Sequence, residues 1–273
     1  MRVAGPMGLA MLLKKASLVG AFFVGAIWQL PALAFCPLPV DPQLVSVRQV
    51  VDGDTLRLND GRSVRLIGIN APEIGRKGRT SEPFAEAARQ RLQALVKASG
   101  AEVGLVPGVE SKDKYGRTLA HIYGRSGDNF EAQLLSEGLG YRVAVAPNVS
   151  LSECQQQAER AARQRKAGVW RQSPVIPAAQ VRQSGFALIG GKVTGIERNR
   201  GGIWIEIDDA LVLQVPVRLQ RNFPPAFLDG LKSRSVETRG WVLDRSRKGG
   251  LKAGQKRWLL PLTDPSMLER VER

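Results

Sequence analysis

Histidine and cysteine are scarce in this sequence, with one histidine and two cysteines among 273 residues. His121 stands in the strand-like segment TLAHIYG, far from either cysteine. This placement disfavours cysteine–histidine catalysis, and we expect an ordinary strand residue there. Cys36 and Cys154 can form only one intramolecular disulfide, which an oxidising compartment would permit. We therefore hypothesise a disulfide that joins the segment around Cys36 to a later helix.

The sequence also lacks an apolar run of the roughly 20 residues that cross a bilayer. Its apolar segment at 16–30 follows three basic residues and precedes the small-residue pattern Ala-Leu-Ala at 32–34. This order is typical of a signal peptide at 1–34, cleaved after Ala34, and it predicts a periplasmic or secreted protein. The alternative is an uncleaved anchor, and only in that case do we expect contact with a membrane.

Acidic residues are few relative to basic ones. The chain has 25 Asp and Glu against 40 Lys and Arg, a formal net charge of +15. Because residues 1–34 hold three positive and no negative side chains, the remaining chain keeps +12. This surplus favours polyanionic partners, nucleic acid first and anionic membrane surfaces second. A merely soluble basic protein is the alternative, and no stable protein partner is predicted.

Alternating, β-branched segments and turn residues predict the first domain, at 40–172. We expect three helices: one over 81–99 capped by Ser81, one over 130–137 capped by Asn129, and one from Ser150 to Gly168 that opens with a capping box. The expected strands lie at 44–51, 55–58, 63–69, 101–107 and 118–124. Together these elements predict an α+β fold, a five-stranded OB-type barrel with three helices.

A second, smaller domain is predicted at 183–265, after a Pro- and Ala-rich linker at 173–182. A short helix is expected at 224–231, between the third and fourth strands of this domain. The strand candidates lie at 186–198, 202–208, 211–219, 235–245 and 257–263. Their order predicts a second OB-like β-barrel.

Opposite charges cluster in the first strands. Asp52 and Asp54 stand two residues apart, so both face the same side of an extended strand. Half-buried charges need partners, either each other or a ligand. Since Ca²⁺ prefers carboxylate and amide oxygens, Asp54, Asp52 and Asn70 are candidate metal ligands. The alternative is a turn in which the two aspartates cap backbone N–H groups.

Arg65, Glu73 and Arg117 add the features of a phosphodiester site. Guanidinium groups match the geometry of a phosphate and offset its charge. A carboxylate such as that of Glu73 can position or deprotonate a water molecule. Directly after Glu73, the loop that contains Arg76, Lys77 and Arg79 could draw in a nucleic-acid backbone, or could be only a solvated loop.

Tryptophans in the second domain are flanked by basic residues. Trp204, Trp241 and Trp258 alternate along the sequence with arginines and lysines at 198–200 and 245–257. This pattern favours an auxiliary surface for single-stranded nucleic acid. The alternative is that the tryptophans belong to the core of the barrel.

The segments VVDGDTLRL, VRLIGINAPE, DKYGRTLAHIY and LLSEGLGYRV resemble, in order and spacing, the thermonuclease (staphylococcal nuclease) family over residues 45–171. The resemblance implies an OB-type barrel that uses one Ca²⁺ ion and hydrolyses phosphodiester bonds of DNA and RNA as an endonuclease. By motif position it implies that Asp54 binds the metal with Asp52 nearby. It also implies that Glu73 is the general base.

By the same resemblance, Arg65 and Arg117 would hold the scissile phosphate. Lys114 and Tyr115, in the turn DKYG, would contact a terminal or flanking phosphate. These roles are implied by the family motif and complete the predicted site.

Two positions depart from the family pattern. Asn70 stands where an aspartate is usual, which removes one negative charge and predicts a weaker metal site. Ala144 and Ala146 replace base-stacking tyrosines, and Tyr141 is nearby but out of register, so binding should depend more on phosphates. An exported nucleic-acid-binding protein with a weakened or inactive nuclease site is therefore the alternative function.

Overall fold

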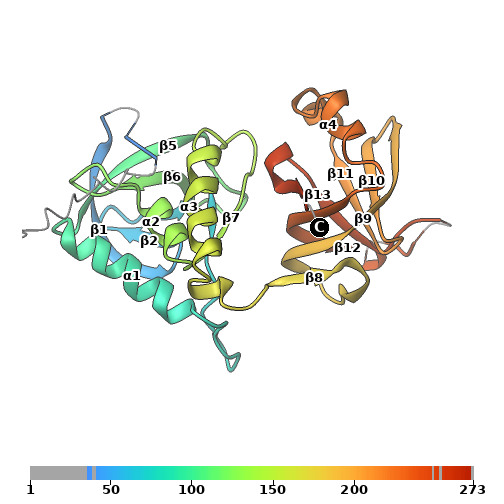
Figure 1. The fold of residues 1–273 in the computed structure, drawn as a ribbon. Helices are drawn as coiled ribbons and strands as arrows, with labels where there is room; N and C mark the ends of the chain where they lie inside the picture. The colour runs from blue at the N-terminus through green and yellow to red at the C-terminus, as the bar shows by residue number, and fades with distance from the viewer. Residues whose placement is uncertain (1–35, 39–40, 248, 252–253, 272–273) are drawn as a thin grey trace, which may run out of the picture. The chain divides into compact units, whose positions relative to one another are not determined.

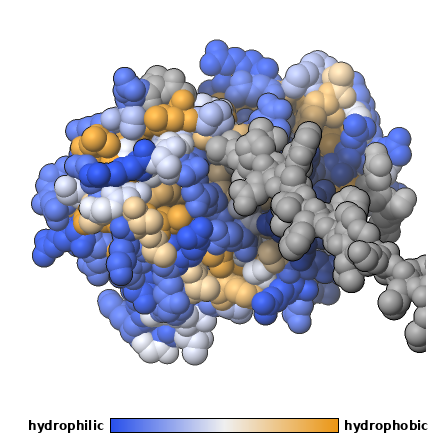
Figure 2. Space-filling view, turned by 60° about the vertical axis from the view of Figure 1, so that its left-hand side comes forward, coloured by the Kyte–Doolittle hydropathy of each residue, from blue (hydrophilic) through white to orange (hydrophobic). Residues whose placement is uncertain are grey.

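The computed structural model describes residues 36–38, 41–247, 249–251 and 254–271, all within one compact unit, Ala34–Arg273. The predicted signal peptide at 1–34 lies outside the described residues. In the described part, no helix is both long and apolar enough to span a membrane. Hydrophilic residues cover most of the face shown in Figure 2, and hydrophobic residues form separate smaller patches there.

Five strands close the first barrel, which confirms the predicted OB-type fold (Figure 1). In sequence order, the third and fifth of these strands run parallel to each other, and all other neighbouring pairs in the barrel are antiparallel. A short additional ladder pairs β4 (Ile69–Asn70) with β7 (Tyr141–Arg142). In barrel order the strands are β1 (Gln43–Asp52), β2 (Thr55–Leu58), β3 (Ser63–Leu66), β6 (Thr118–Tyr123) and β5 (Glu102–Lys112).

The first helix, α1 (Ala85–Ala98), begins later than predicted, and its predicted cap is wrong. Its N-cap is Phe84, and the Ser81 hydroxyl instead accepts a hydrogen bond from the Gly75 N–H. The cause is Pro83, because the residue before a proline is disfavoured in the helical region.

The other two helices are α2 (Phe130–Ser136) and α3 (Ser152–Gln164). The Asn129 side chain accepts from the Ala132 N–H, so the predicted cap of α2 is confirmed. The predicted capping box of α3 does not form: the Ser152 N–H bonds to the Val149 carbonyl in a preceding turn, and Leu151 becomes the N-cap. This helix also ends before Gly168, because Lys166 adopts the left-handed conformation at φ 51° that terminates helices.

The second barrel repeats the strand connectivity of the first. In sequence order, its third and fifth strands are parallel, and its fourth strand pairs with its first to close the ring. Helix α4 (Pro225–Asp229) lies between the third and fourth strands in sequence, as α1 does in the first barrel. The ring strands are β9 (Gly185–Asn199), β10 (Gly202–Ile207), β11 (Leu211–Val215), β13 (Trp258–Pro261) and β12 (Ser235–Asp244).

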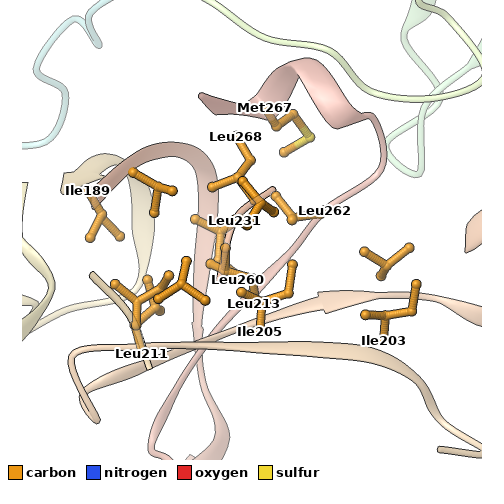
Figure 3. Packing of buried hydrophobic residues seen from close by; sticks show 14 of the residues in the cluster. Ile189, Ile203, Ile205, Leu211, Leu213, Leu231, Leu260, Leu262, Met267 and Leu268 are labelled. Carbon is orange, nitrogen blue, oxygen red and sulfur yellow. The ribbon is translucent and has the colours of Figure 1, made fainter. Parts of the chain in front are cut away.

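Two short strands extend this sheet. β8 (Val175–Pro177) lies in the segment expected as a linker and pairs in parallel with β9. β14 (Leu268–Arg270) pairs with β12. The core of the barrel comes from the period-two pattern of its strands, as in β10, where Ile203, Ile205 and Ile207 are buried. Figure 3 shows this core, in which Ile205, Leu213 and Leu260 pack together.

Cys36 and Cys154 are joined by a disulfide with a Cα–Cα distance of 5.2 Å. The bond links residue 36 to α3 across 118 positions of sequence. A cross-link over so long a loop restricts the unfolded chain strongly, so it favours the folded state.

Buried charges join α3 and β7 of the first barrel to the second barrel. The Arg239 guanidinium on β12 lies 2.5 Å from the Glu159 carboxylate on α3, and both side chains are only 2% exposed. Glu159 also accepts the Arg142 N–H at 2.7 Å. At the edge of this group, Arg163 pairs with Glu237 at 2.6 Å. Each buried charge therefore has a partner of opposite sign from the other barrel or from its own.

We predict that Glu159→Gln lowers the free energy of unfolding by about 3 kcal/mol, because it leaves the buried Arg239 charge under-compensated. Urea unfolding measures this change. The control Glu86→Gln removes one partner of an exposed pair with Arg89, and should change stability by less than about 0.5 kcal/mol. Equal small effects of the two substitutions would contradict the importance of the buried pair.

Candidate active site

Asp52 and Asp54 flank a tight turn between β1 and β2. The Asp54 N–H donates to the Asp52 carboxylate at 3.1 Å, and the Thr55 hydroxyl donates to Asp54 at 3.0 Å. A Cβ on Gly53 would lie 2.6 Å from the Cβ atoms of Ala71 and Ala88, so only glycine lets the turn approach α1 this closely. The backbone-capping role that we considered as the alternative is thus present for both aspartates, since Asp52 accepts the Asp54 N–H and Asp54 accepts the Ala71 N–H.

The two carboxylates are mostly buried, with exposed side-chain fractions of 16% for Asp52 and 10% for Asp54. Burial, followed by the charge of Asp54, raises the pKa of Asp52 to about 6. The raised pKa means that burial and the neighbouring Asp54 charge disfavour the ionised form of Asp52. This turn is therefore a place where a bound cation would be favourable.

Arg65 on β3 connects Asp54 to Asn70. Its Nη2 atom lies 3.0 Å from the Asp54 carboxylate and donates to the Asn70 side-chain oxygen at 3.2 Å. Its Nη1 atom donates to the carbonyls of Leu66 and Ile69. The Asp54 carboxylate also accepts the Ala71 N–H at 2.8 Å. The guanidinium of Arg65 thus brings two candidate metal ligands together and is itself committed to protein contacts.

Glu73 is held by a residue that sequence reasoning missed. The Glu73 N–H donates to the Glu82 carboxylate at 2.9 Å, and the Glu82 N–H donates to the Glu73 carbonyl at 2.9 Å. Partial burial, then the charges of Asp54 and Glu82, raise the pKa of Glu73. A carboxylate with a raised pKa is a better proton acceptor at neutral pH. Nothing in the sequence signals this reciprocal contact, which depends on the loop folding back.

Arg117 lies at the end of the turn between β5 and β6. Its Nε donates to Asp113 at 2.7 Å, which orients the guanidinium. Partial burial acts to raise the pKa of Asp113, but hydrogen bonds from Arg117 and Tyr115 lower it overall. Within the described residues, the terminal nitrogens of Arg117 have no hydrogen-bond acceptor. They are therefore available to an anion.

Lys114 and Tyr115 form the tip of the same turn. The Lys114 ammonium lies 5.0 Å from the centre of the Tyr115 ring, and Tyr115 is 72% exposed. A cation beside an open aromatic face can contact both the phosphate and the base of a nucleotide.

A cleft of about 1130 Å³ brings the predicted residues together. Lys77 is not among the lining residues, whereas Arg79 of the same loop is. Arg76 is 63% exposed and lies 3.9 Å from Asp52. The predicted site residues that line the cleft are Asp52, Asp54, Arg65, Asn70, Glu73, Arg76, Lys114, Tyr115 and Arg117.

Among its described residues, the second barrel contributes one to the lining of this cleft, Trp241 on β12. The second barrel also packs on the segment that carries Ala144 and Ala146. Both alanines are buried in a cluster with the core of the second barrel, and the Thr263 hydroxyl donates to the Ala144 carbonyl at 2.8 Å. Large side chains at 144 and 146 would not fit under this barrel. Trp241 was considered in the sequence only for an auxiliary surface, because its position beside the site depends on tertiary structure.

Known proteins are similar to the first barrel. Residues 63–172 match the profile of the family described as staphylococcal nuclease homologue. Thermonuclease of Staphylococcus intermedius is 34% identical over 128 residues, 45% of this chain and 74% of that protein. Thermonuclease of Staphylococcus hyicus is 30% identical over 131 residues, 47% of this chain and 76% of that protein. Endonuclease YncB of Bacillus subtilis is 31% identical over 137 residues, 48% of this chain and 64% of that protein.

These similarities and the closed barrel agree with the resemblance seen in the sequence motifs. The matched residues include the strand of Arg65 and the turns of Glu73 and Arg117. The chain therefore belongs to the staphylococcal nuclease family.

Proposed function

We propose that this nuclease is a calcium-dependent endonuclease that hydrolyses phosphodiester bonds of both DNA and RNA. The observation that carries the proposal is that three carboxylates and two arginines line the same cleft. These residues are Asp52, Asp54, Glu73, Arg65 and Arg117, and the pKa of Asp52 and of Glu73 is raised. This combination provides oxygen ligands, a proton acceptor and phosphate donors at one place. The net positive charge of the chain favours the same polyanionic substrate.

The donor atoms fit one calcium ion. Asp54, Asp52 and Asn70 can each provide a side-chain oxygen, the ligand atom that Ca²⁺ prefers. In the described part of the chain, no group of three or more His, Cys, Asp or Glu side chains could hold a metal ion, so an ion at this turn would depend on the Asn70 amide as well as the two carboxylates. When bound, the ion would supply positive charge that stabilises the pentavalent phosphate. The raised pKa of Asp52 supports a cation at this turn.

Glu73 would accept a proton from the attacking water. Its backbone is held by Glu82, and its raised pKa suits a base that works near neutral pH. Arg117 would bind the scissile phosphate through its terminal nitrogens, because Asp113 engages only its Nε and backbone N–H. Arg65 could donate to a phosphate only by giving up contacts with Asp54 or Asn70. Arg117 is therefore the more accessible of the two donors.

Residues at the rim of the cleft would guide the substrate. Lys114 and Tyr115 suit a phosphate and a base that flank the scissile bond. Arg76, which is exposed beside Asp52, would attract the backbone. Because these contacts are mainly electrostatic, binding should weaken strongly as salt concentration rises.

A nucleic-acid-binding protein without cleavage is the second candidate. It is favoured by one observation: the Arg65 guanidinium contacts both the Asp54 carboxylate and the Asn70 amide oxygen, and it already neutralises part of the Asp54 charge. If Arg65 kept this position at all calcium concentrations, the cleft would bind a polyanion without cutting it.

A cleavage assay with a long single-stranded DNA and a single-stranded RNA distinguishes these functions. We expect the purified protein to cut both in Ca²⁺ and neither in chelator. Glu73→Gln should lower kcat by about 10²- to 10⁴-fold, because it removes the proton acceptor. Arg117→Ala should lower it by about 10²- to 10³-fold, because it removes charge stabilisation.

The matched control is Glu110→Gln, which removes a carboxylate of the same cleft that has no assigned role. It should leave kcat within about twofold of the wild type. Binding without cleavage in every condition would contradict the endonuclease and favour the second candidate. Cleavage that persists in chelator would contradict the metal requirement.

Asn70→Asp should strengthen calcium binding about tenfold, since a carboxylate ligand adds one negative charge. Isothermal titration calorimetry measures the Kd. As control, Asn59→Asp adds the same charge at an exposed hairpin position outside the cleft and should leave the Kd unchanged. Equal affinity of Asn70→Asp and the wild type would show that residue 70 is not a ligand.

We also propose that the protein is exported, with residues 1–34 removed. The disulfide between Cys36 and Cys154 supports this, because such bonds persist mainly in oxidising compartments. After expression in the source cell, intact mass should indicate a chain that begins at Phe35, with two thiols alkylated only after reduction. A chain that retains residues 1–34 and two free thiols would contradict export, and would leave membrane contact as the alternative.

A further inference from the structure

We propose that Trp241, together with Phe186 and Tyr141, forms a stacking subsite for nucleobases of single-stranded nucleic acid beside the catalytic cleft. This inference rests on the proposed function, because it assigns the place of a base relative to the scissile phosphate. The subsite is built from both barrels, since Tyr141 belongs to β7 and the other two residues to β12 and β9.

Trp241 differs from the other tryptophans of the second barrel. It occupies an outward-facing position of β12 and is 39% exposed. Trp258 is 8% exposed and belongs to the core, as the structural alternative predicted. Trp204 is partly buried, and its indole N–H donates to Asn199 at 2.9 Å. Of these three side chains, only Trp241 lines the cleft that holds Glu73.

Aromatic rings continue from Trp241 toward the first barrel. The Phe186 ring lies 5.4 Å from Trp241 and 5.6 Å from Tyr141, measured between ring centres. In the strand pairing, Trp241 stands directly opposite Phe186. Tyr141 contacts Trp170 in turn at 5.5 Å. These neighbours fix the orientation of the exposed indole, so little side-chain entropy is lost when a base stacks on it.

A second cleft, of about 1000 Å³, adjoins the catalytic one along these rings. Its lining includes Phe84, Tyr141, Phe186 and Trp241. Both clefts are lined by Glu73 and Trp241, as well as by Asn70 and Glu82. The two clefts therefore meet at Glu73, the proposed proton acceptor. A nucleic-acid strand whose phosphate lies at Glu73 can therefore continue along the aromatic wall.

Basic side chains accompany the aromatic wall. Arg171 and Arg182 are exposed and line the second cleft, and the Arg171 guanidinium lies 5.7 Å from the Phe84 ring. Aromatic rings alternating with arginines suit a strand whose bases stack while its phosphates meet positive charge. Paired bases in a duplex do not offer their faces, so this subsite favours single-stranded or frayed substrates.

The position of Trp241 is fixed by the buried ion pair two residues earlier on the same strand. Arg239 on β12 is paired with Glu159 on α3 of the first barrel, and both side chains are almost fully buried. The indole is thus attached rigidly to the barrel that carries Glu73. The second barrel covers Ala144 and Ala146 and supplies an aromatic side chain of its own.

Binding of two oligonucleotides in chelator tests the subsite separately from cleavage. One is a fluorescein-labelled 12-mer of thymidine, and the other has the same backbone with abasic sites throughout. We expect the wild type to bind the thymidine strand about five- to a hundredfold more tightly, as measured by fluorescence anisotropy. Trp241→Ala should reduce this ratio by about fivefold or more, and Trp241→Phe should restore part of it.

Trp204→Ala is the matched control, because it removes a tryptophan of the same barrel that lines neither cleft. It should leave the ratio unchanged. A ratio near one in the wild type, or an unchanged ratio in Trp241→Ala, would overturn the subsite. If the ratio behaves as expected while no strand is cut in Ca²⁺, the proposed endonuclease fails and the subsite stands.

Discussion

The ion pair between Glu159 and Arg239 is the contact on which the arrangement of the two barrels depends. Removing both charges from water is costly, so the pair is favourable only when every remaining polar atom finds a partner. Glu159 meets this condition by also accepting the Arg142 N–H, and Arg239 by also pairing with Glu237. Few other dockings of the barrels would satisfy these groups. The pair therefore selects one arrangement, and this arrangement brings β12 and Trp241 to the edge of the catalytic cleft.

Charge in the cleft is balanced rather than simply accumulated. Arg65 compensates the charge of Asp54 and also donates to the Asn70 amide oxygen, Asp113 orients Arg117, and Arg76 lies beside Asp52. Burial, followed by the charge of Asp54, raises the pKa of both Asp52 and Glu73. These are the two carboxylates for which the proposed chemistry needs a cation or a proton. The paired charges of Asp54, Arg65 and Asp113 thus hold the site together, whereas Asp52 and Glu73 are the groups available for a cation or a proton.

Both barrels were predictable because their strands alternate buried and exposed residues and are separated by turn residues. The connectivity of the second barrel, with β11 parallel to β13, agrees with the spacing of its segments. Element boundaries were less predictable. Because of Pro83, α1 begins at Ala85 rather than directly after Ser81. A turn that ends at Ser152 replaces the expected capping box of α3. In both cases a local backbone constraint outweighed a side-chain preference of similar size.

The sequence by itself determined the two barrels, the family motifs and most of the candidate site, since these depend on residue spacing along single strands and turns. Only the tertiary structure decided that Glu82 supports Glu73, that Arg79 rather than Lys77 lines the cleft, and that Trp241 lies beside it. Such contacts join segments nine to about 170 residues apart, and no local periodicity encodes them. They follow from how a loop folds back and how two barrels dock, which packing and buried charge select together.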